Sequence, residues 1–166
     1  MHFYLLSIIF LLNVVNASTS LISPIWGETD FKNIIIGELN NSSHTITATI
    51  YKMDDDDIIN TLENCGKNNI NLRLICDKSI IKTCNKFSNY GDIIPFKMTP
   101  FTKLHAKSIL IDNSTLIIGS FNLDKSAFNQ NIEIGVIIKD KNIIMKYHSF
   151  VNELIYYPYI YGATNK

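Results

Sequence analysis

The chain has 166 residues, 46% of them hydrophobic, and a formal net charge of zero. This length and composition indicate one globular domain with a substantial core. The balanced charge excludes a protein that binds nucleic acid through an overall positive field, although a local basic groove stays open.

The first seventeen residues have the layout of a secretory signal peptide. Residues 3–15 form an apolar run that ends at Val15. Val15 and Ala17 are small residues at the −3 and −1 positions of a cleavage site. The run is shorter than the roughly 20 residues needed to cross a bilayer. We therefore expect residues 1–17 to be removed and residues 18–166 to form one secreted or endomembrane-lumenal domain. The alternative is an uncleaved segment that anchors the protein to a membrane.

Three cysteines become relevant if the chain is exported, because an oxidising compartment allows one disulfide. Cys76 falls within a strand-like segment and is interpreted as a buried strand residue. Cys65 and Cys84 are then the expected pair.

The first half of the domain predicts a βαβ unit. Residues 18–43 give no clear element beyond an apolar patch at residues 34–36. Residues 44–52 alternate as a strand. Residues 54–66 predict a helix with four aspartates at its start, where the helix dipole favours negative charge, and with Gly66 as its C-terminal cap. A metal site is the weaker interpretation of these acids, because consecutive side chains on a helix diverge. Residues 71–77 predict a strand parallel to the first.

The second half predicts further strands and a long final helix. We expect a helix over residues 78–91 and a short strand over 92–96. A strand over 104–111 is followed by a turn at Asn113-Ser114 and a second strand that ends at residue 118. A short helix near Ser126 and a strand over 132–138 come next. An amphipathic helix is predicted over residues 140–156. Its expected buried face consists of Ile144, Tyr147, Val151 and Leu154. The fold class is α/β, a mixed sheet flanked by helices.

One predicted strand carries two unusual polar side chains. Alternation places His105 and Lys107 on one face, at the end of an otherwise apolar row. A partly buried ammonium is costly unless an anion meets it. Gly119 leaves the backbone open to a ligand, and Ser120 and Asn122 add donors. Glu133, on the following strand, could orient an imidazole. These residues describe a pocket for a tetrahedral anion, with an imidazole placed to attack it.

The spacing H-x-K-x4-D-x6-G-S-x-N resembles the signature of the phospholipase D superfamily. It stands here as His105, Lys107, Asp112, Gly119, Ser120 and Asn122, with Glu133 in a matching downstream segment. The resemblance covers about residues 30–155 and includes one motif, as in the short bacterial phospholipase-D-like endonucleases and the Zucchini-type mitochondrial cardiolipin hydrolase. It implies a phospholipase D-like fold and a phosphodiesterase that needs no metal or other cofactor.

The resemblance also implies a role for each residue. His105 is the expected nucleophile, which forms a phosphohistidine. Lys107, Ser120 and Asn122 hold the phosphate oxygens, and Glu133 accepts a hydrogen bond from the imidazole of His105. Asp112 is expected to orient neighbouring groups. A second histidine protonates the leaving oxygen, so a homodimer with a shared active site is expected.

The substrate remains open between phospholipid and nucleic acid. Three lysines near the motif, Lys97, Lys103 and Lys125, could follow a nucleic-acid backbone or meet anionic headgroups. The apolar side chains of Phe96, Met98 and Phe101 suit peripheral membrane contact or base stacking. A catalytically silent phosphate-binding module is the alternative function, although binding alone does not require an imidazole and a carboxylate.

Overall fold

The computed structural model describes residues 19–23, 31–96 and 102–161. The predicted signal peptide and the loop that carries Lys97, Met98 and Phe101 lie outside these residues. Among the described helices, none is long and apolar enough to cross a membrane.

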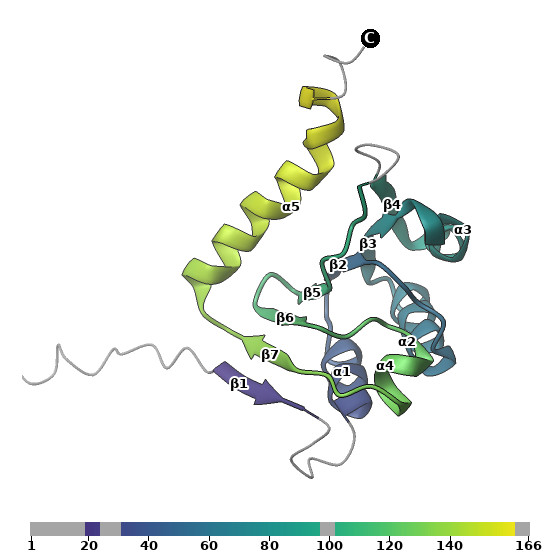
Figure 1. Ribbon diagram of the computed structural model, residues 1–166, viewed down its shortest axis with the longest axis vertical. Helices are drawn as coiled ribbons and strands as arrows, with labels where there is room; N and C mark the ends of the chain where they lie inside the picture. The colour runs from purple at the N-terminus through teal and green to yellow at the C-terminus, as the bar shows by residue number, and fades with distance from the viewer. Residues whose placement is uncertain (1–18, 24–30, 97–101, 162–166) are drawn as a thin grey trace, which may run out of the picture.

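A mixed sheet forms the centre of the fold, as predicted (Figure 1). It has seven strands, one more than the sequence indicated. In spatial order its strands are β1 (Thr19–Ile22), β7 (Gly135–Ile138), β6 (Thr115–Gly119), β5 (Ser108–Ile111), β2 (Thr45–Ile50), β3 (Asn71–Asp77) and β4 (Gly91–Phe96). The pairs β2/β3 and β3/β4 are parallel, and the other neighbours are antiparallel. The sheet therefore joins a βαβ half to a hairpin half.

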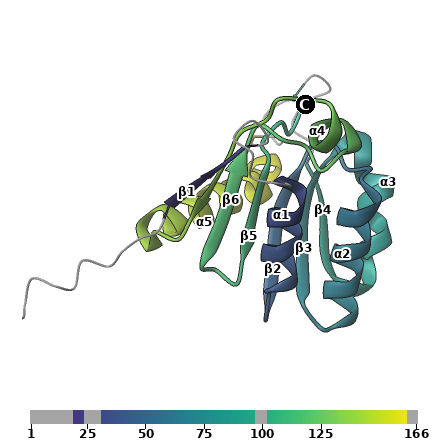
Figure 2. The same cartoon turned by 90° about the horizontal axis from the view of Figure 1, so that it is seen from below.

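Helices cover the two faces of the sheet unequally (Figure 2). One face packs on α1 (Phe31–Asn40) and α2 (Asp56–Lys67), and this side holds the larger apolar core. The other face packs on α5 (Lys141–Tyr161) through Leu110 and Leu116. The buried residues Ile144, Tyr147 and Val151 of α5 are those predicted from its periodicity.

The amino-terminal elements were missed by the sequence interpretation. Helix α1 buries Phe31, Ile35 and Leu39, which repeat at four-residue spacing. The adjacent apolar residues at 34–36 obscure this helical period in the sequence. Strand β1 is a four-residue edge strand, too short to show a pattern, and it pairs antiparallel with β7.

The segment after β3 is not the single helix that was predicted. It contains a 3₁₀ turn (Lys78–Ile80), α3 (Ile81–Cys84) and a second 3₁₀ segment (Asn85–Tyr90). Its serine, threonine and asparagine side chains compete with helical hydrogen bonding. Gly91 begins β4 with a φ of 151°, a conformation that favours glycine.

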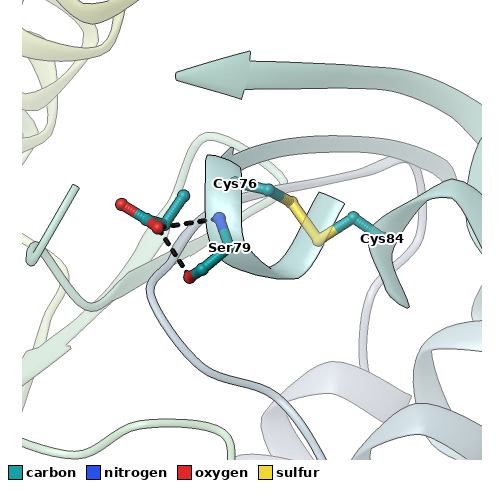
Figure 3. The surroundings of a disulfide bond; sticks show 4 residues. Cys76, Ser79 and Cys84 are labelled. Carbon is teal, nitrogen blue, oxygen red and sulfur yellow. Dashed lines mark hydrogen bonds between the residues drawn. A yellow bond between two sulfur atoms is a disulfide. The ribbon is translucent and has the colours of Figure 1, made fainter. Parts of the chain in front are cut away.

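The expected disulfide pairing was wrong. Cys76, on β3, is bonded to Cys84, on α3 (Figure 3). Cys65 is a buried free thiol. Cys65 faces the layer between α2 and α1, where its sulfur lies 3.5 Å from the carbonyl oxygen of Leu39. Gly66 is likewise not a cap: it lies inside α2, where a Cβ atom would collide with the ring of Tyr90.

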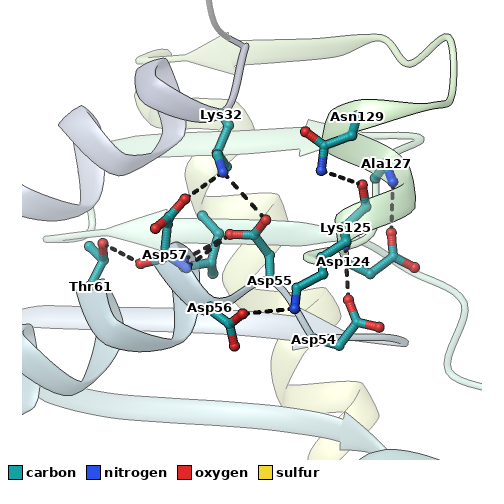
Figure 4. Close-up of polar contacts among 11 residues, drawn as sticks. Lys32, Asp54, Asp55, Asp56, Asp57, Thr61, Asp124, Lys125, Ala127 and Asn129 are labelled. Atoms are coloured by element: carbon teal, nitrogen blue, oxygen red, sulfur yellow. Dashed lines mark hydrogen bonds and ion pairs between the residues drawn. The ribbon is translucent and has the colours of Figure 1, made fainter.

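The four consecutive aspartates join three helices (Figure 4). Asp55 caps α2 by accepting hydrogen bonds from the amides of Asp57 and Ile58, as expected for acids at a helix start. Lys32 of α1 pairs with Asp55 and Asp57. Asp56 pairs with Lys125 at 2.7 Å, at the start of α4 (Lys125–Asn129), and Asp54 accepts from the backbone amide of Lys125.

Candidate active site

Most of the predicted site residues meet at one end of the sheet. Strands β2, β3 and β6 end there, and β5 and β7 begin there, because β5 runs antiparallel to β2 and β7 runs antiparallel to β6. The segments that precede or follow these strand ends therefore converge from distant parts of the sequence.

His105 and Lys107 lie in the segment that leads into β5. The strand ladder begins at Ser108, so the two residues precede the strand rather than alternate along it as predicted. Their predicted adjacency is confirmed. The Lys107 Nζ atom lies 3.0 Å from Nδ1 and 3.2 Å from Nε2 of His105, and it donates a 2.8 Å hydrogen bond to the His105 carbonyl oxygen. The imidazole is exposed, whereas Lys107 is only 9% exposed.

The electrostatics of Lys107 suit an anion site. Burial lowers the pKa of its ammonium, the carboxylates of Glu133 and Asp124 oppose this effect, and Lys52 adds to it. A bound phosphate would compensate for the lost hydration of this charge.

Tyr51 is a site residue that the sequence interpretation missed. Its ring lies against that of His105, with the centroids 4.6 Å apart. The sequence marked Tyr51 only as the end of a strand. Its neighbour could be identified only from the register between β2 and β5, in which Thr49 pairs with Ser108.

Ser120 and Glu133 form a second polar unit of the site. The Ser120 hydroxyl donates to Glu133 and accepts a 3.1 Å hydrogen bond from the amide of Ile134. The Asn131 side chain donates to the other Glu133 oxygen at 3.1 Å. Glu133 is buried and lies just before β7 rather than on it. Within one chain this carboxylate contacts Ser120 and Asn131, not His105 as expected.

The structure requires glycine at position 119 for a different reason from the one predicted. A Cβ atom at this position would meet the carbonyl oxygen of Ile134 at 2.5 Å and collide with the ring of Phe121. The glycine therefore makes room for the buried Phe121 ring rather than for a ligand.

Asn122 lines a cavity of about 10 Å³ together with Lys107, Thr49 and Tyr51. This volume is about that needed for one water molecule. The buried Asn122 Oδ1 atom has no hydrogen-bond partner among the described residues. An unpaired buried amide oxygen favours a ligand or a lysine contact here, because leaving it unpaired is costly.

Asp112 lies at the opposite end of β5 from His105. Its carboxylate accepts hydrogen bonds of 2.7–2.8 Å from the amides of Ser43, His44 and Thr45, at the start of β2. Burial alone would raise the pKa of Asp112, but these amides outweigh it and hold the pKa below its ordinary value. The residue stabilises the turn at residues 112–114 and does not contact the other motif residues.

An apolar groove of about 450 Å³ opens beside His105. It runs between β6 and α5, and its apolar walls include Ile118, Ile143 and Phe150. These three side chains are 38%, 43% and 38% exposed, so the groove continues into an exposed apolar face. Phe96, which was expected at an apolar loop edge, is instead buried in the core on this side of the sheet.

The sequence is similar to those of known proteins over most of its length. Residues 35–155 match the family described as "Cardiolipin synthase, PLD-like domain". The chain is 30% identical over 137 residues to a phospholipase D of Rickettsia prowazekii, an alignment that spans 80% of this chain and 64% of that relative. It is 29% identical over 102 residues to cardiolipin synthase A of Buchnera aphidicola, across 57% of this chain and 21% of the relative.

Solved structures share the fold. NucT from Helicobacter pylori superposes with a TM-score of 0.70 at 20% identity, covering 82% of this chain and 94% of that structure. Nuc from Salmonella typhimurium, a phospholipase D family member, gives 0.68 at 21% identity with the same coverage.

Proposed function

Because the chain belongs to the phospholipase D superfamily, we propose that it is a phosphodiester hydrolase whose nucleophile is His105. The observation that carries this proposal is the exposed His105 imidazole beside the buried Lys107 ammonium, at the sheet end that also holds Ser120, Asn122 and Glu133. The substrate is a phosphodiester of phospholipid or nucleic acid.

In the proposed reaction, a nitrogen of His105 attacks phosphorus and the bond to the leaving oxygen breaks. Lys107, Ser120 and Asn122 stabilise the charge on the non-bridging oxygens. A second imidazole protonates the leaving oxygen and then takes a proton from the water that attacks the phosphohistidine. The products are an alcohol and a phosphomonoester, and His105 is regenerated.

The second imidazole comes from a second copy of the chain. An in-line displacement needs the acid on the side of phosphorus opposite the nucleophile, and a two-fold pair brings the same residue from each chain to the axis. His105 lines the apolar groove, so a copy that brings its own His105 to the site approaches over this face and covers Ile118, Ile143 and Phe150. We assign the imidazole contact of Glu133 to His105 of that second copy, because within the chain Glu133 faces Ser120 and Asn131.

The chain is also proposed to be exported. The Cys76–Cys84 disulfide supports this, because such bonds persist in oxidising compartments. Protein from its native host is expected to begin at Ser18, as measured by mass spectrometry. An intact amino terminus in a membrane fraction would support the anchored alternative.

The function is tested by offering the mature protein single-stranded DNA, RNA, phosphatidylcholine and cardiolipin side by side. Turnover of one of these substrates, lost in His105→Ala without loss of folding, is the expected result. Turnover by His105→Ala at the wild-type rate would refute the nucleophile, and turnover of no substrate would favour the silent binding module.

Mixing subunits tests the shared site. When equal amounts of wild-type and His105→Ala chains exchange fully, about one quarter of the dimers should stay active if both imidazoles are needed. Activity of about one half would show that each chain works alone.

A further inference from the structure

Three lysines surround the ring of Tyr51. The Nζ atoms of Lys107, Lys103 and Lys52 lie 5.1, 5.9 and 6.0 Å from the ring centroid. The same Tyr51 ring also contacts His105, the proposed nucleophile. The lysine cluster therefore lies next to the candidate active site. The cluster brings together the segment after β2 and the segment before β5, which are fifty residues apart in the sequence.

The positive charges of Lys52 and Lys103 are not neutralised within the described part of the chain. The ion pairs found there use other basic residues, which are Lys32, Lys67, Arg73 and Lys125. Both lysines are exposed, and Lys125, which was also predicted to follow a nucleic-acid backbone, is occupied by Asp56. A cation–π contact contributes about 0.5–1 kcal/mol at an exposed site. It does not offset the charges of Lys52 and Lys103, whereas the carboxylates of Glu133 and Asp124 act on Lys107.

One scissile phosphodiester cannot balance this cluster. Such a group carries a single negative charge and would lie at His105 beside Lys107, on which Glu133 and Asp124 also act. The exposed side chains of Lys52 and Lys103 can therefore pair with further negative charge that arrives with the substrate. A nucleic-acid strand supplies one phosphate with every nucleotide, whereas a headgroup with one phosphate supplies none beyond the phosphate that reacts. An aromatic ring among lysines is also a combination that binds single strands.

We propose that Tyr51, Lys52 and Lys103 form a second phosphate subsite, which binds the phosphate next to the scissile one in a single-stranded nucleic acid. This inference rests on the proposed function and specifies its substrate class. The subsite lies on the β2 side of His105, and the apolar groove lies on the β6 and α5 side, so a strand bound there does not compete with the second copy for the groove.

The test measures binding separately from hydrolysis. Fluorescence anisotropy follows a labelled short oligothymidylate with full-length His105→Ala protein, which cannot cleave the probe, over a range of salt concentrations. Each of Lys52→Ala and Lys103→Ala should reduce the slope of log affinity against log salt by about 0.7, because each phosphate contact with a single strand contributes about that much. Lys82→Ala, an exposed lysine of α3, is the matched control and should leave the slope unchanged.

Two results would overturn the subsite. The first is a slope that Lys52→Ala and Lys103→Ala leave unchanged. The second is lysine-dependent binding to vesicles of phosphatidylcholine and cardiolipin without binding to the oligothymidylate, which would assign the cluster to a lipid with two phosphates.

A separate assay distinguishes these results from failure of the proposed function. Bis-para-nitrophenyl phosphate has one phosphodiester, so its hydrolysis by the wild type and not by His105→Ala tests the chemistry alone. Hydrolysis of this compound with lysine-independent oligothymidylate binding removes the subsite and keeps the function. Lysine-dependent binding of oligothymidylate without hydrolysis of this compound would keep the subsite and refute the proposed hydrolase function.

Discussion

The Oδ2 atom of Asp77 accepts a 2.9 Å hydrogen bond from the backbone amide of Leu104, the residue directly before His105. Asp77 ends β3, and its other oxygen accepts from the amide and hydroxyl of Ser79. Burial would raise the pKa of Asp77, but the donors of Ser79 and Leu104 outweigh it and keep the pKa below its ordinary value. An ionised buried carboxylate thus fixes the path of the backbone into the candidate nucleophile.

Replacing Asp77 should therefore impair turnover without touching substrate. In Asp77→Ala the amide of Leu104 loses its acceptor and the His105 segment shifts. A displacement of about 1 Å can lower a rate roughly a hundredfold. We expect kcat to fall more than KM rises, with Asp77→Asn retaining more activity than Asp77→Ala. Asp92→Ala, an exposed carboxylate on the neighbouring strand β4, should have wild-type kinetics. Equal kcat in Asp77→Ala and wild type would contradict the positioning role.

Asp112 should contribute stability rather than catalysis. Asp112→Asn weakens the contacts with three backbone amides and should lower the free energy of unfolding by roughly 2 kcal/mol near neutral pH. Because the folded state lowers the pKa of Asp112, its contribution is complete above the ordinary carboxyl pKa and is lost as pH falls through the lowered value. Denaturant unfolding at several pH values should show the difference between wild type and variant shrinking in acid. Glu153→Gln, an exposed position on α5, is the control, and a difference that grows in acid would refute this account.

The Cys76–Cys84 bond closes a loop with a sequence separation of eight residues. Loop-closure entropy for this length corresponds to about 2.5 kcal/mol. The double variant Cys76→Ala/Cys84→Ala should lose stability of this order, and its unfolding should no longer respond to reductant. Cys65→Ala should keep the reductant response of the wild type. A reductant effect that disappears only in Cys65→Ala would mean that Cys65 belongs to the bond.

The apolar groove face should control both assembly and activity. Phe150→Glu places a charge at the proposed interface, and we expect light scattering to report a monomer with little turnover. Met145→Glu lies on the same helix, α5, at an exposed position that does not line the groove, and it should remain dimeric and active. A fully active Phe150→Glu monomer would disprove the shared site.

Catalysis should survive excess chelator. Lys107 and the hydroxyl of Ser120 supply the charge and the donor that a metal ion would otherwise provide. The aspartates at 54–57 are engaged by lysines and backbone amides. Turnover measured with and without EDTA should agree within error. Loss with EDTA and recovery with one particular divalent ion would overturn this expectation.

The sequence predicted best where local periodicity and tertiary packing agree. The helical spacing of Ile58 and Leu62 and the apolar face of α5 each mark a single buried side, and the alternation of residues 45–50 marks the apolar face of β2, although Thr49 on the other face is buried as well. These patterns were sufficient for the parallel β2/β3 pair and the mixed sheet. The β5–β6 turn was also correct, with Asp112 and Asn113 in left-handed conformations.

What could not be predicted depends on contacts between distant segments. Tyr51 reaches His105 only through the β2/β5 register, and the partners of Glu133 depend on how the segment before β7 turns toward Ser120. The spacing of the cysteines did not determine their pairing, because Cys76 looks like an ordinary strand residue until α3 brings Cys84 beside it. The motif identified residues that meet at one end of the sheet, but it grouped Asp112 with them, although Asp112 lies at the other end of β5.

The division of the sheet into two ends has a practical consequence for anyone who labels this protein. The turn between α2 and β3, at residues 68–70, lies at the Asp112 end, away from His105, and Asn69 already adopts a φ of 65° in an exposed position. A short epitope or a dye-bearing peptide spliced in at Asn69 should be tolerated, because exposed turns accept insertions. Such a reporter could follow the protein in living cells without approaching the candidate active site.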